Sequence, residues 1–219
     1  MINQPARSAF LSKHYALFKG LLVSGGMAFI AALMAGIASG RIGADCLSTV
    51  TCILSIVVAY PLKMLPGRKT LKSIPGVKLL MIGTCFALTV VLTAQISGGG
   101  AAVMLDTARV VKLALAFGLW GSSSANLSDV HDIEGDKAEG VTTLAVLLGP
   151  GWAWALSLAM SMAAAAALLG LDSVGAGITG MIWVAMAACW TPEVTSLSSF
   201  LRLRQFGWLT FSVPALLWG

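Results

Sequence analysis

The stretch from Ser128 to Gly149 reads SDVHDIEGDKAEGVTTLAVLLG and holds five of the nine acidic residues in the chain. The five are Asp129, Asp132, Glu134, Asp136 and Glu139. If the stretch is helical, Asp129, Asp132 and Asp136 fall at positions i, i+3 and i+7 on one helix face. Three carboxylates on one face repel each other unless a cation lies between them, and hard oxygen ligands suit Mg²⁺ or Ca²⁺. The alternative interpretation is a solvated acidic loop.

The composition indicates a polytopic membrane protein. The chain has 219 residues, of which 58% are hydrophobic and 11% are charged, and its mean hydropathy is +0.89. A soluble domain would carry about a quarter charged residues. The four cysteines are scattered and form no CxxC pair, so we interpret them as packing residues. The net charge of +5 comes without a basic stripe interleaved with aromatics, which argues against a nucleic-acid partner.

Seven apolar runs predict an all-α membrane helical bundle with about seven transmembrane helices, in a single membrane domain over residues 1–219. The runs cover residues 18–39, 47–65, 77–96, 110–127, 152–171, 174–190 and 206–218. Most approach the roughly 20 residues that are needed to cross a hydrocarbon core of about 30 Å. The acidic motif 128–149 follows the fourth run directly and is expected as a loop between the fourth and fifth spans.

The distribution of basic residues predicts the orientation. With seven spans, 11 of the 14 Lys and Arg residues fall on the side of the N-terminus and the acidic motif. The positive-inside rule therefore places both in the cytoplasm. The basic loop Lys63–Lys78 lies on the same side. Carboxylates that hold Mg²⁺ beside Lys and Arg side chains are what a metal-bound diphosphate requires, whereas topology signalling and contact with lipid headgroups are the simpler explanation of the loop.

Residues 129–144 resemble the second aspartate-rich motif of the UbiA-type intramembrane prenyltransferases, which reads roughly D-x-x-D-x-E-G-D-R-x-x-G-x-x-T-L-P. The matching positions are Asp129, Asp132, Gly135, Asp136, Gly140, Thr143 and Leu144. Two weaker similarities lie upstream, in Tyr60–Lys63 with Leu71–Lys78 and in Ile2–Arg7. The resemblance therefore covers most of the chain.

The chain also departs from the family pattern. Family members have nine spans and a first motif of the form N-D-x-x-D-x-x-x-D after the second span. Ile2–Arg7 resembles the segment that follows this motif, so the resemblance implies that the given sequence lacks the first two helices and the first motif. The fold expected from the resemblance is thus a truncated nine-helix bundle. Lys137 replaces the usual arginine, and a lysine contacts phosphate as a point charge without bidentate geometry.

The resemblance implies Mg²⁺-dependent transfer of an isoprenyl group from a prenyl diphosphate to an aromatic or lipid acceptor. Asp129, Asp132 and Asp136 would hold the metal. The expected diphosphate-binding residues are Lys137, Arg68, Lys69 and Lys72. His131 and Asn126 are further candidates, although a loop histidine and a helix-packing amide are the simpler interpretations. The catalytic residues remain open.

The missing first motif leaves enzymatic activity open. The alternative is a non-catalytic subunit of a larger membrane complex that binds a prenyl lipid, quinone or pigment, or acts structurally. The expected partners are membrane lipid, an isoprenyl diphosphate and other membrane chains that would complete the site. A transporter is disfavoured because the apolar runs contain almost no charged residues.

Overall fold

The computed structural model describes residues 13–40, 42–60, 62, 71, 74–97, 106–138, 140–171 and 174–189. These residues form six helices and no strand. The helices are α2 (Tyr15–Ala38), α3 (Cys46–Ala59), α4 (Val77–Ser97), α5 (Thr107–Ala138), α6 (Leu144–Leu169) and α7 (Val174–Cys189). The prediction of an all-α membrane bundle is confirmed. The last apolar run, 206–218, and the N-terminal segment Ile2–Arg7 lie outside the described residues.

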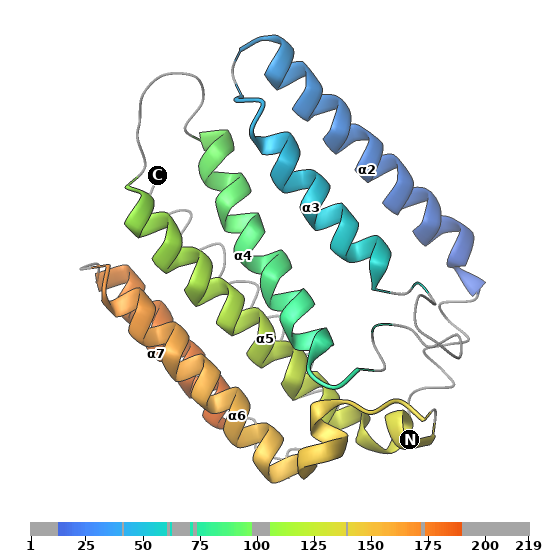
Figure 1. Ribbon diagram of the computed structural model, residues 1–219, viewed down its shortest axis with the longest axis vertical. Coiled ribbons are helices and arrows are strands. Elements are labelled where there is room, and N and C mark those ends of the chain that lie inside the picture. Colours follow the sequence, from blue (N-terminus) through green and yellow to red (C-terminus); the bar gives the residue numbers. More distant parts are fainter. Residues whose placement is uncertain are drawn as a thin grey trace.

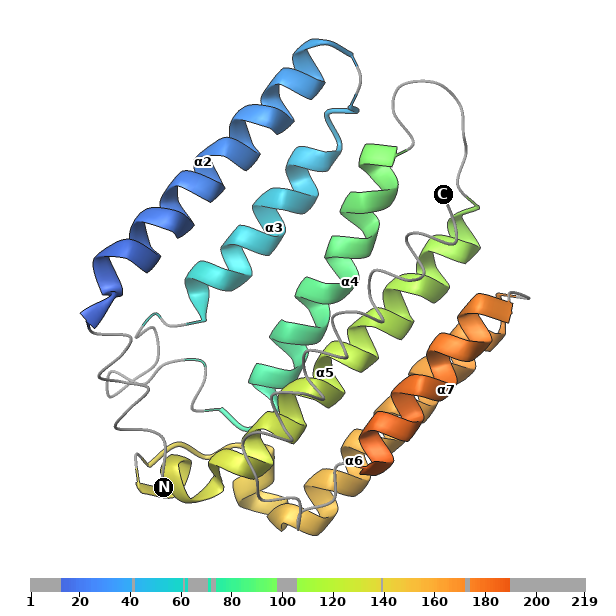
Figure 2. The same cartoon turned by 180° about the vertical axis from the view of Figure 1, so that it is seen from behind.

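Consecutive helices lie side by side through most of the bundle (Figures 1 and 2). From α3 onward, each helix packs against the next one in the chain. One end of the bundle therefore holds the start of α4, the end of α5 and the start of α6. The opposite end holds the start of α5 and the end of α6, where Lys112 Nζ donates a hydrogen bond to the Gly170 carbonyl oxygen over 2.7 Å.

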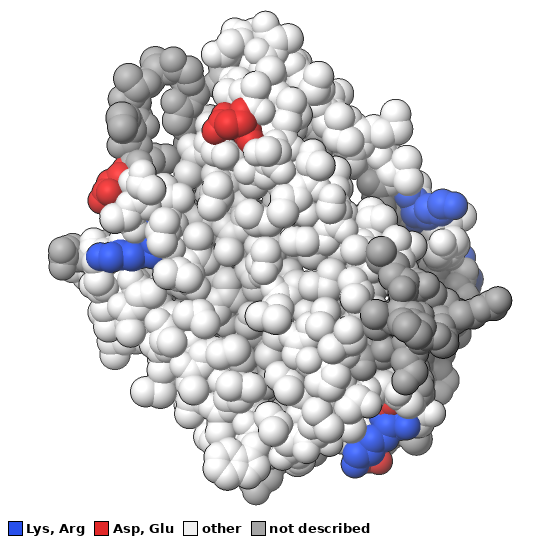
Figure 3. Space-filling view, in the orientation of Figure 1, with Lys and Arg blue, Asp and Glu red and all other residues white. Residues whose placement is uncertain are grey.

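The outer surface suits lipid. Three helical segments, Tyr15–Ala38, Val77–Ile96 and Leu144–Leu169, are long and apolar enough to cross a membrane, and Cys46–Ala59 and Val174–Ala185 are shorter apolar helices. Many large apolar side chains point outward, among them Met27, Leu80 and Met181. Figure 3 shows a broad uncharged area on one face, with the Lys, Arg, Asp and Glu side chains near its margins. A bundle with these properties can expose apolar side chains because its surroundings are apolar as well.

The largest cluster of buried apolar side chains among the described residues lies between α5, α6 and α7. Trp120 of α5 stacks on Trp183 of α7 with ring centroids 5.1 Å apart, and Phe117 meets Trp183 edge-on at 5.4 Å. Ala164 and Leu168 of α6 fill the remaining space. Offset and edge-on aromatic pairs add to the burial of their apolar area, so this cluster fixes α7 against α5.

Small residues allow α4 and α5 to approach closely. A Cβ atom placed on Gly83 of α4 would lie 2.8 Å from the Gly118 carbonyl oxygen of α5, and one placed on Gly121 would lie 2.5 Å from the Phe86 ring. The Ser122 hydroxyl donates a hydrogen bond across the same interface to the Leu79 carbonyl oxygen over 2.9 Å. Close backbone contact through small residues is the usual way in which helices associate in lipid. This interface sets the register between α4 and α5.

The helix boundaries correct three predictions. The second apolar run was expected to extend to Leu65, but α3 ends at Ala59. The fourth apolar run was expected to end at Leu127 and to be followed by an acidic loop, but α5 continues as a helix to Ala138. The fifth run was expected to begin at Trp152, but α6 begins at Leu144 and contains a kink at Gly149, where φ is 78° and ψ is 165°. Pro150 follows the kink, and proline disfavours a helical conformation at the residue before it.

Candidate functional site

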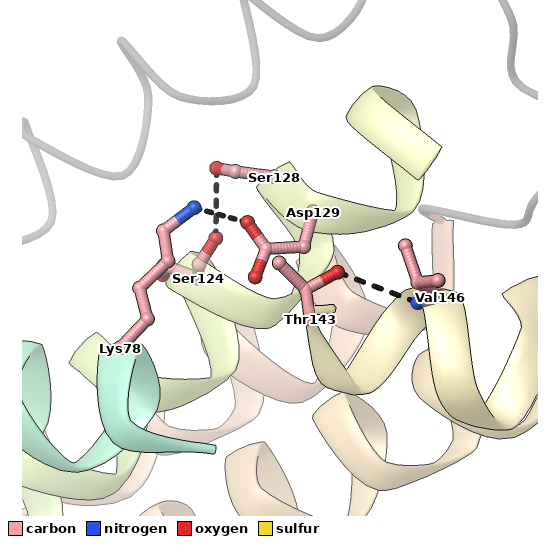
Figure 4. A network of polar contacts seen from close by, with 6 residues as sticks. All are labelled: Lys78, Ser124, Ser128, Asp129, Thr143 and Val146. Carbon is pink, nitrogen blue, oxygen red and sulfur yellow. Dashed lines mark hydrogen bonds and ion pairs between the residues drawn. The ribbon is translucent and has the colours of Figure 1, made fainter. Parts of the chain in front are cut away.

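The centre of the candidate site is Asp129, which is fully buried beyond the apolar part of α5. Lys78, in the first turn of α4, donates a hydrogen bond to Asp129 Oδ1 and forms an ion pair with it (Figure 4). The side chain of Lys78 is 27% exposed, whereas that of Asp129 is 1% exposed. The other carboxylate oxygen, Asp129 Oδ2, is buried and has no hydrogen-bond partner among the described residues. A buried charged oxygen without a partner is costly, so this atom indicates a site for a ligand.

A tight turn positions Lys78. The Val77 amide donates to the Ile74 carbonyl oxygen over 3.2 Å, and Gly76 has a φ of 79°. Proline at the second position of a turn and glycine with positive φ at the third are the features of a type II turn. The sequence Ile74-Pro75-Gly76-Val77 therefore ends the preceding loop abruptly and starts α4, with Lys78 in its first turn.

The three aspartates share a helix but differ in burial. Because α5 runs to Ala138, the helical condition for their common face is met. Asp132 is exposed and Asp136 is partly buried. Burial raises the pKa of Asp129, the hydrogen bond from Lys78 opposes that increase, and the charges of Asp136 and Asp132 add to it. The charges of Asp132 and Asp136 thus act on the buried Asp129 carboxylate.

Tyr60, which follows α3, lies near the same group of charges. Burial raises the pKa of its phenol, and the nearby Lys78 ammonium opposes this increase. The carboxylates of Asp129 and Asp136 add to the increase. Three elements that are distant in the sequence therefore contribute to one polar region at this end of the bundle.

Two residues of the acidic motif have structural roles. The Val141 amide donates to the Asp136 carbonyl oxygen over 2.8 Å, the Gly140 amide donates to the Lys137 carbonyl oxygen over 3.2 Å, and Gly140 has a φ of 69°. This is the Schellman arrangement that ends a helix. Thr143 then starts α6, because its side chain accepts a hydrogen bond from the Val146 amide over 3.3 Å. The glycine and the threonine of the motif therefore fix the turn that follows the aspartates.

The donor chemistry of the site fits a hard divalent cation. All three aspartates offer carboxylate oxygens, and the buried Asp129 Oδ2 is available for coordination. Within the described part of the chain, no three His, Cys, Asp or Glu side chains are grouped closely enough to hold a metal ion. A cation at Asp129 would therefore have to bring the exposed Asp132 side chain inward. The assignment of Asp129, Asp132 and Asp136 as metal ligands stays a prediction.

The predicted phosphate ligands are only partly described. Lys137 lies in the last turn of α5 and forms an exposed ion pair with Glu134, with a nitrogen–oxygen distance of 3.6 Å. Arg68, Lys69 and Lys72 lie outside the described residues, and so does the side chain of His131. The structure instead brings Lys78 to the acidic motif. Lys78 belongs to the predicted basic loop, and its charge alone did not distinguish it from the other lysines of that loop.

Asn126 connects α5 to α6 through its side-chain nitrogen, and its role in the site stays a prediction. It is fully buried, and its side-chain nitrogen donates to the Ala153 carbonyl oxygen over 2.6 Å and to the Ser157 hydroxyl over 2.8 Å. Ser123 extends this contact by donating to the Ser157 carbonyl oxygen over 2.8 Å. The polar ladder holds α5 against α6 one turn before Asp129, which fixes the position of that carboxylate.

Comparison with known proteins identifies the fold. The model of the UbiA prenyltransferase family matches residues 8–212. Searches of curated proteins and of solved structures find no significant match. The family match covers nearly the whole chain, including every described helix and the entire acidic motif. The chain therefore belongs to the UbiA prenyltransferase family.

Proposed function

We propose that the chain transfers an isoprenyl group from a prenyl diphosphate to an aromatic or lipid acceptor, with Mg²⁺ held by Asp129, Asp132 and Asp136. Membership of the family supports prenyl transfer in general. The observation that carries the proposal is the buried Asp129 carboxylate, whose Oδ2 atom has no hydrogen-bond partner among the described residues. Burial of such a group lowers the stability of an apolar bundle, and this cost is expected where the group binds a ligand.

In this proposal the acidic residues bind the metal and the basic residues bind the diphosphate. The three carboxylates hold the metal, and the ammonium groups of Lys78 and Lys137 contact phosphate oxygens, together with the basic residues Arg68, Lys69 and Lys72. The metal ion would neutralise charge on the departing diphosphate. The apolar helix surfaces receive the hydrocarbon tail from the lipid. We place the acidic motif and the N-terminus on the cytoplasmic side, following the excess of basic residues there.

The test measures release of diphosphate. Membranes containing the chain are incubated with prenyl diphosphates of several lengths and a panel of aromatic and lipid acceptors, with Mg²⁺ or with excess chelator. We expect Mg²⁺-dependent release that falls at least about a hundredfold in Asp129→Asn, since removal of a charge-stabilising group typically costs 10²–10³ in rate. Asp45→Asn is the matched control, because this acidic residue is exposed and precedes α3, at the end of that helix away from Tyr60. Equal release by the Asp129→Asn variant would refute the assignment.

One observation favours the non-catalytic alternative. Lys78 already compensates the charge of Asp129, so this buried carboxylate does not require a metal in order to be tolerated. A UbiA-like subunit that binds a prenyl lipid, quinone or pigment within a larger complex would then retain the pair for packing. No diphosphate release with any acceptor, together with normal assembly of the Asp132→Asn and Asp136→Asn variants, would support this alternative over the enzyme.

A further inference from the structure

We propose that Lys78 is an exchangeable counter-ion: it holds Asp129 while the site lacks substrate and moves to the diphosphate when the metal–diphosphate complex enters. The inference rests on the proposed function for the identity of the second ligand. In this proposal Lys78 determines whether the divalent cation binds before the diphosphate or together with it. The site then has low affinity for the divalent cation alone and higher affinity for the cation together with its diphosphate.

The first argument is that the two oxygens of Asp129 have different surroundings. Lys78 occupies Oδ1, while Oδ2 is buried and has no partner in the described part of the chain. A single ammonium therefore leaves half of this carboxylate unsatisfied. Because each buried carboxylate oxygen accepts hydrogen bonds or a metal, the pair is an incomplete arrangement that a second cation can replace.

The second argument concerns the charges of the site. Among the described residues, the carboxylates of Asp132 and Asp136 act on Asp129 together with the ammonium of Lys78. Tyr60 also faces the pair within this part of the chain, and its phenol is neutral near pH 7. The described carboxylates near Lys78 therefore outnumber it, which favours the entry of a divalent cation. When the cation binds, the Lys78 ammonium becomes a like-charged neighbour of the metal and is repelled.

The third argument is that the Lys78 side chain can change its partner. The Lys78 side chain is 27% exposed, in contrast to the 1% of Asp129, so part of this side chain borders solvent while α4 stays folded. A lysine has a flexible four-carbon stem and acts as a point charge. The ammonium released from Asp129 can therefore contact a phosphate oxygen nearby while the type II turn before α4 keeps its backbone fixed.

The proposal is tested by two affinities, one for the metal alone and one for the prenyl diphosphate analogue with the metal, which should change in opposite directions. Purified protein in detergent is titrated with Mn²⁺, a paramagnetic substitute for Mg²⁺, and the free ion is measured by electron paramagnetic resonance. The titration is then repeated with an excess of a non-hydrolysable prenyl diphosphate analogue. For Lys78→Met we expect Mn²⁺ alone to bind about tenfold more tightly, because a competing charge is removed. We expect the analogue with Mn²⁺ to bind about tenfold more weakly, because a charged phosphate contact is lost.

The controls separate this proposal from damage to the fold and from failure of the site. Lys78→Arg retains the positive charge in a planar guanidinium, so it should change both affinities less than Lys78→Met does. Lys112→Met changes a lysine at the opposite end of the bundle and should leave both affinities unchanged. Lys78→Gln keeps a hydrogen-bond donor without the charge, and it carries the test if the methionine variant does not fold.

Each result decides a different question. Weaker or unchanged binding of Mn²⁺ alone by both Lys78→Met and Lys78→Gln would overturn the counter-ion proposal while the proposed metal site stands. If the wild type and Asp129→Asn bind Mn²⁺ equally, the metal site itself is wrong, and the proposal for Lys78 is refuted with it. Tighter binding of the metal together with weaker binding of the analogue cannot result from partial unfolding, which weakens both.

Discussion

The substitution Gly83→Ala tests the close contact that aligns α4 with α5. The added Cβ atom would lie 2.2 Å from Ser122 Oγ and 2.8 Å from the Gly118 carbonyl oxygen. The serine hydroxyl can rotate away, but it then loses its hydrogen bond to the Leu79 carbonyl oxygen. The Gly118 carbonyl belongs to the backbone of α5 and cannot rotate, so the two helices must separate.

The expected loss of stability follows from three contributions. Overpacking of a tight contact costs about 1–3 kcal/mol. The lost hydrogen bond of Ser122 costs about 1 kcal/mol, while alanine is favoured over glycine in a helix by about 1 kcal/mol. The last two contributions cancel, so Gly83→Ala should lower the free energy of unfolding by about 1–3 kcal/mol.

The assay compares this variant with Gly25→Ala in the exposed helix α2, where an added Cβ meets nothing within 4 Å. Unfolding in mixed micelles by titration with sodium dodecyl sulphate is followed by tryptophan fluorescence. Gly25→Ala should be neutral or stabilise by up to about 1 kcal/mol through helix propensity alone. If Gly83→Ala is as stable as Gly25→Ala, the described packing of α4 against α5 is wrong, and so is the alignment of Lys78 with Asp129 that depends on it.

Three further variants test the turn and the ladder around the acidic motif, with unfolding measured in the same way. Gly140→Ala forces a side chain into the left-handed region at φ 69° and should destabilise by about 1–2 kcal/mol, whereas Gly151→Ala, which meets nothing within 4 Å, should not destabilise. Thr143→Val removes the cap that accepts from the Val146 amide and should cost about 1 kcal/mol, and Thr143→Ser should retain most of that stability. Asn126→Asp replaces a buried donor with a charged acceptor that faces a carbonyl oxygen of α6. It should lower the free energy of unfolding by about 3 kcal/mol or more. An unfolding curve like that of the wild type would contradict the described hydrogen bonds between α5 and α6.

Much of the fold could be predicted from apolar runs. The run 77–96 matches α4 to within one residue, and the run 174–190 matches α7 equally well. The errors lie at the end of α3, where the run 47–65 extends beyond Ala59, and at the two helix ends beside the acidic motif. A hydropathy run ends where contact with lipid ends, but a helix ends where its last carbonyl groups find partners. α5 ends eleven residues beyond Leu127, where those partners come from the Gly140 turn. At the start of α6 the cap is Thr143 rather than the first tryptophan of the apolar run.

The site was predictable only where its residues are near each other in the sequence. The spacing of the three aspartates placed them on one helix face without any tertiary information. The partner of Asp129 is 51 residues away, and its position depends on the Gly83–Gly118 contact, which no local pattern of the basic loop contains. Several lysines and arginines of that loop were equivalent on charge alone. The turn Ile74-Pro75-Gly76-Val77 was the available signal, because it fixes the start of α4 and so singles out the lysine that follows.

The residues of the acidic motif therefore have two different roles, one in the turn and one at the buried carboxylate. Gly140 and Thr143 shape the turn between α5 and α6, so they would be retained in an active enzyme and in a non-catalytic subunit alike. The buried Asp129 is different, because Lys78 leaves one of its oxygens without a partner among the described residues. A purely structural pair gains nothing from that open oxygen, and a hydrophobic replacement of both residues would be neutral or stabilising. Substitution of Lys78 and Asp129 together by apolar residues of similar size should accordingly preserve the bundle and abolish binding of Mn²⁺. Loss of the fold in that double variant would show that the pair serves packing rather than a ligand.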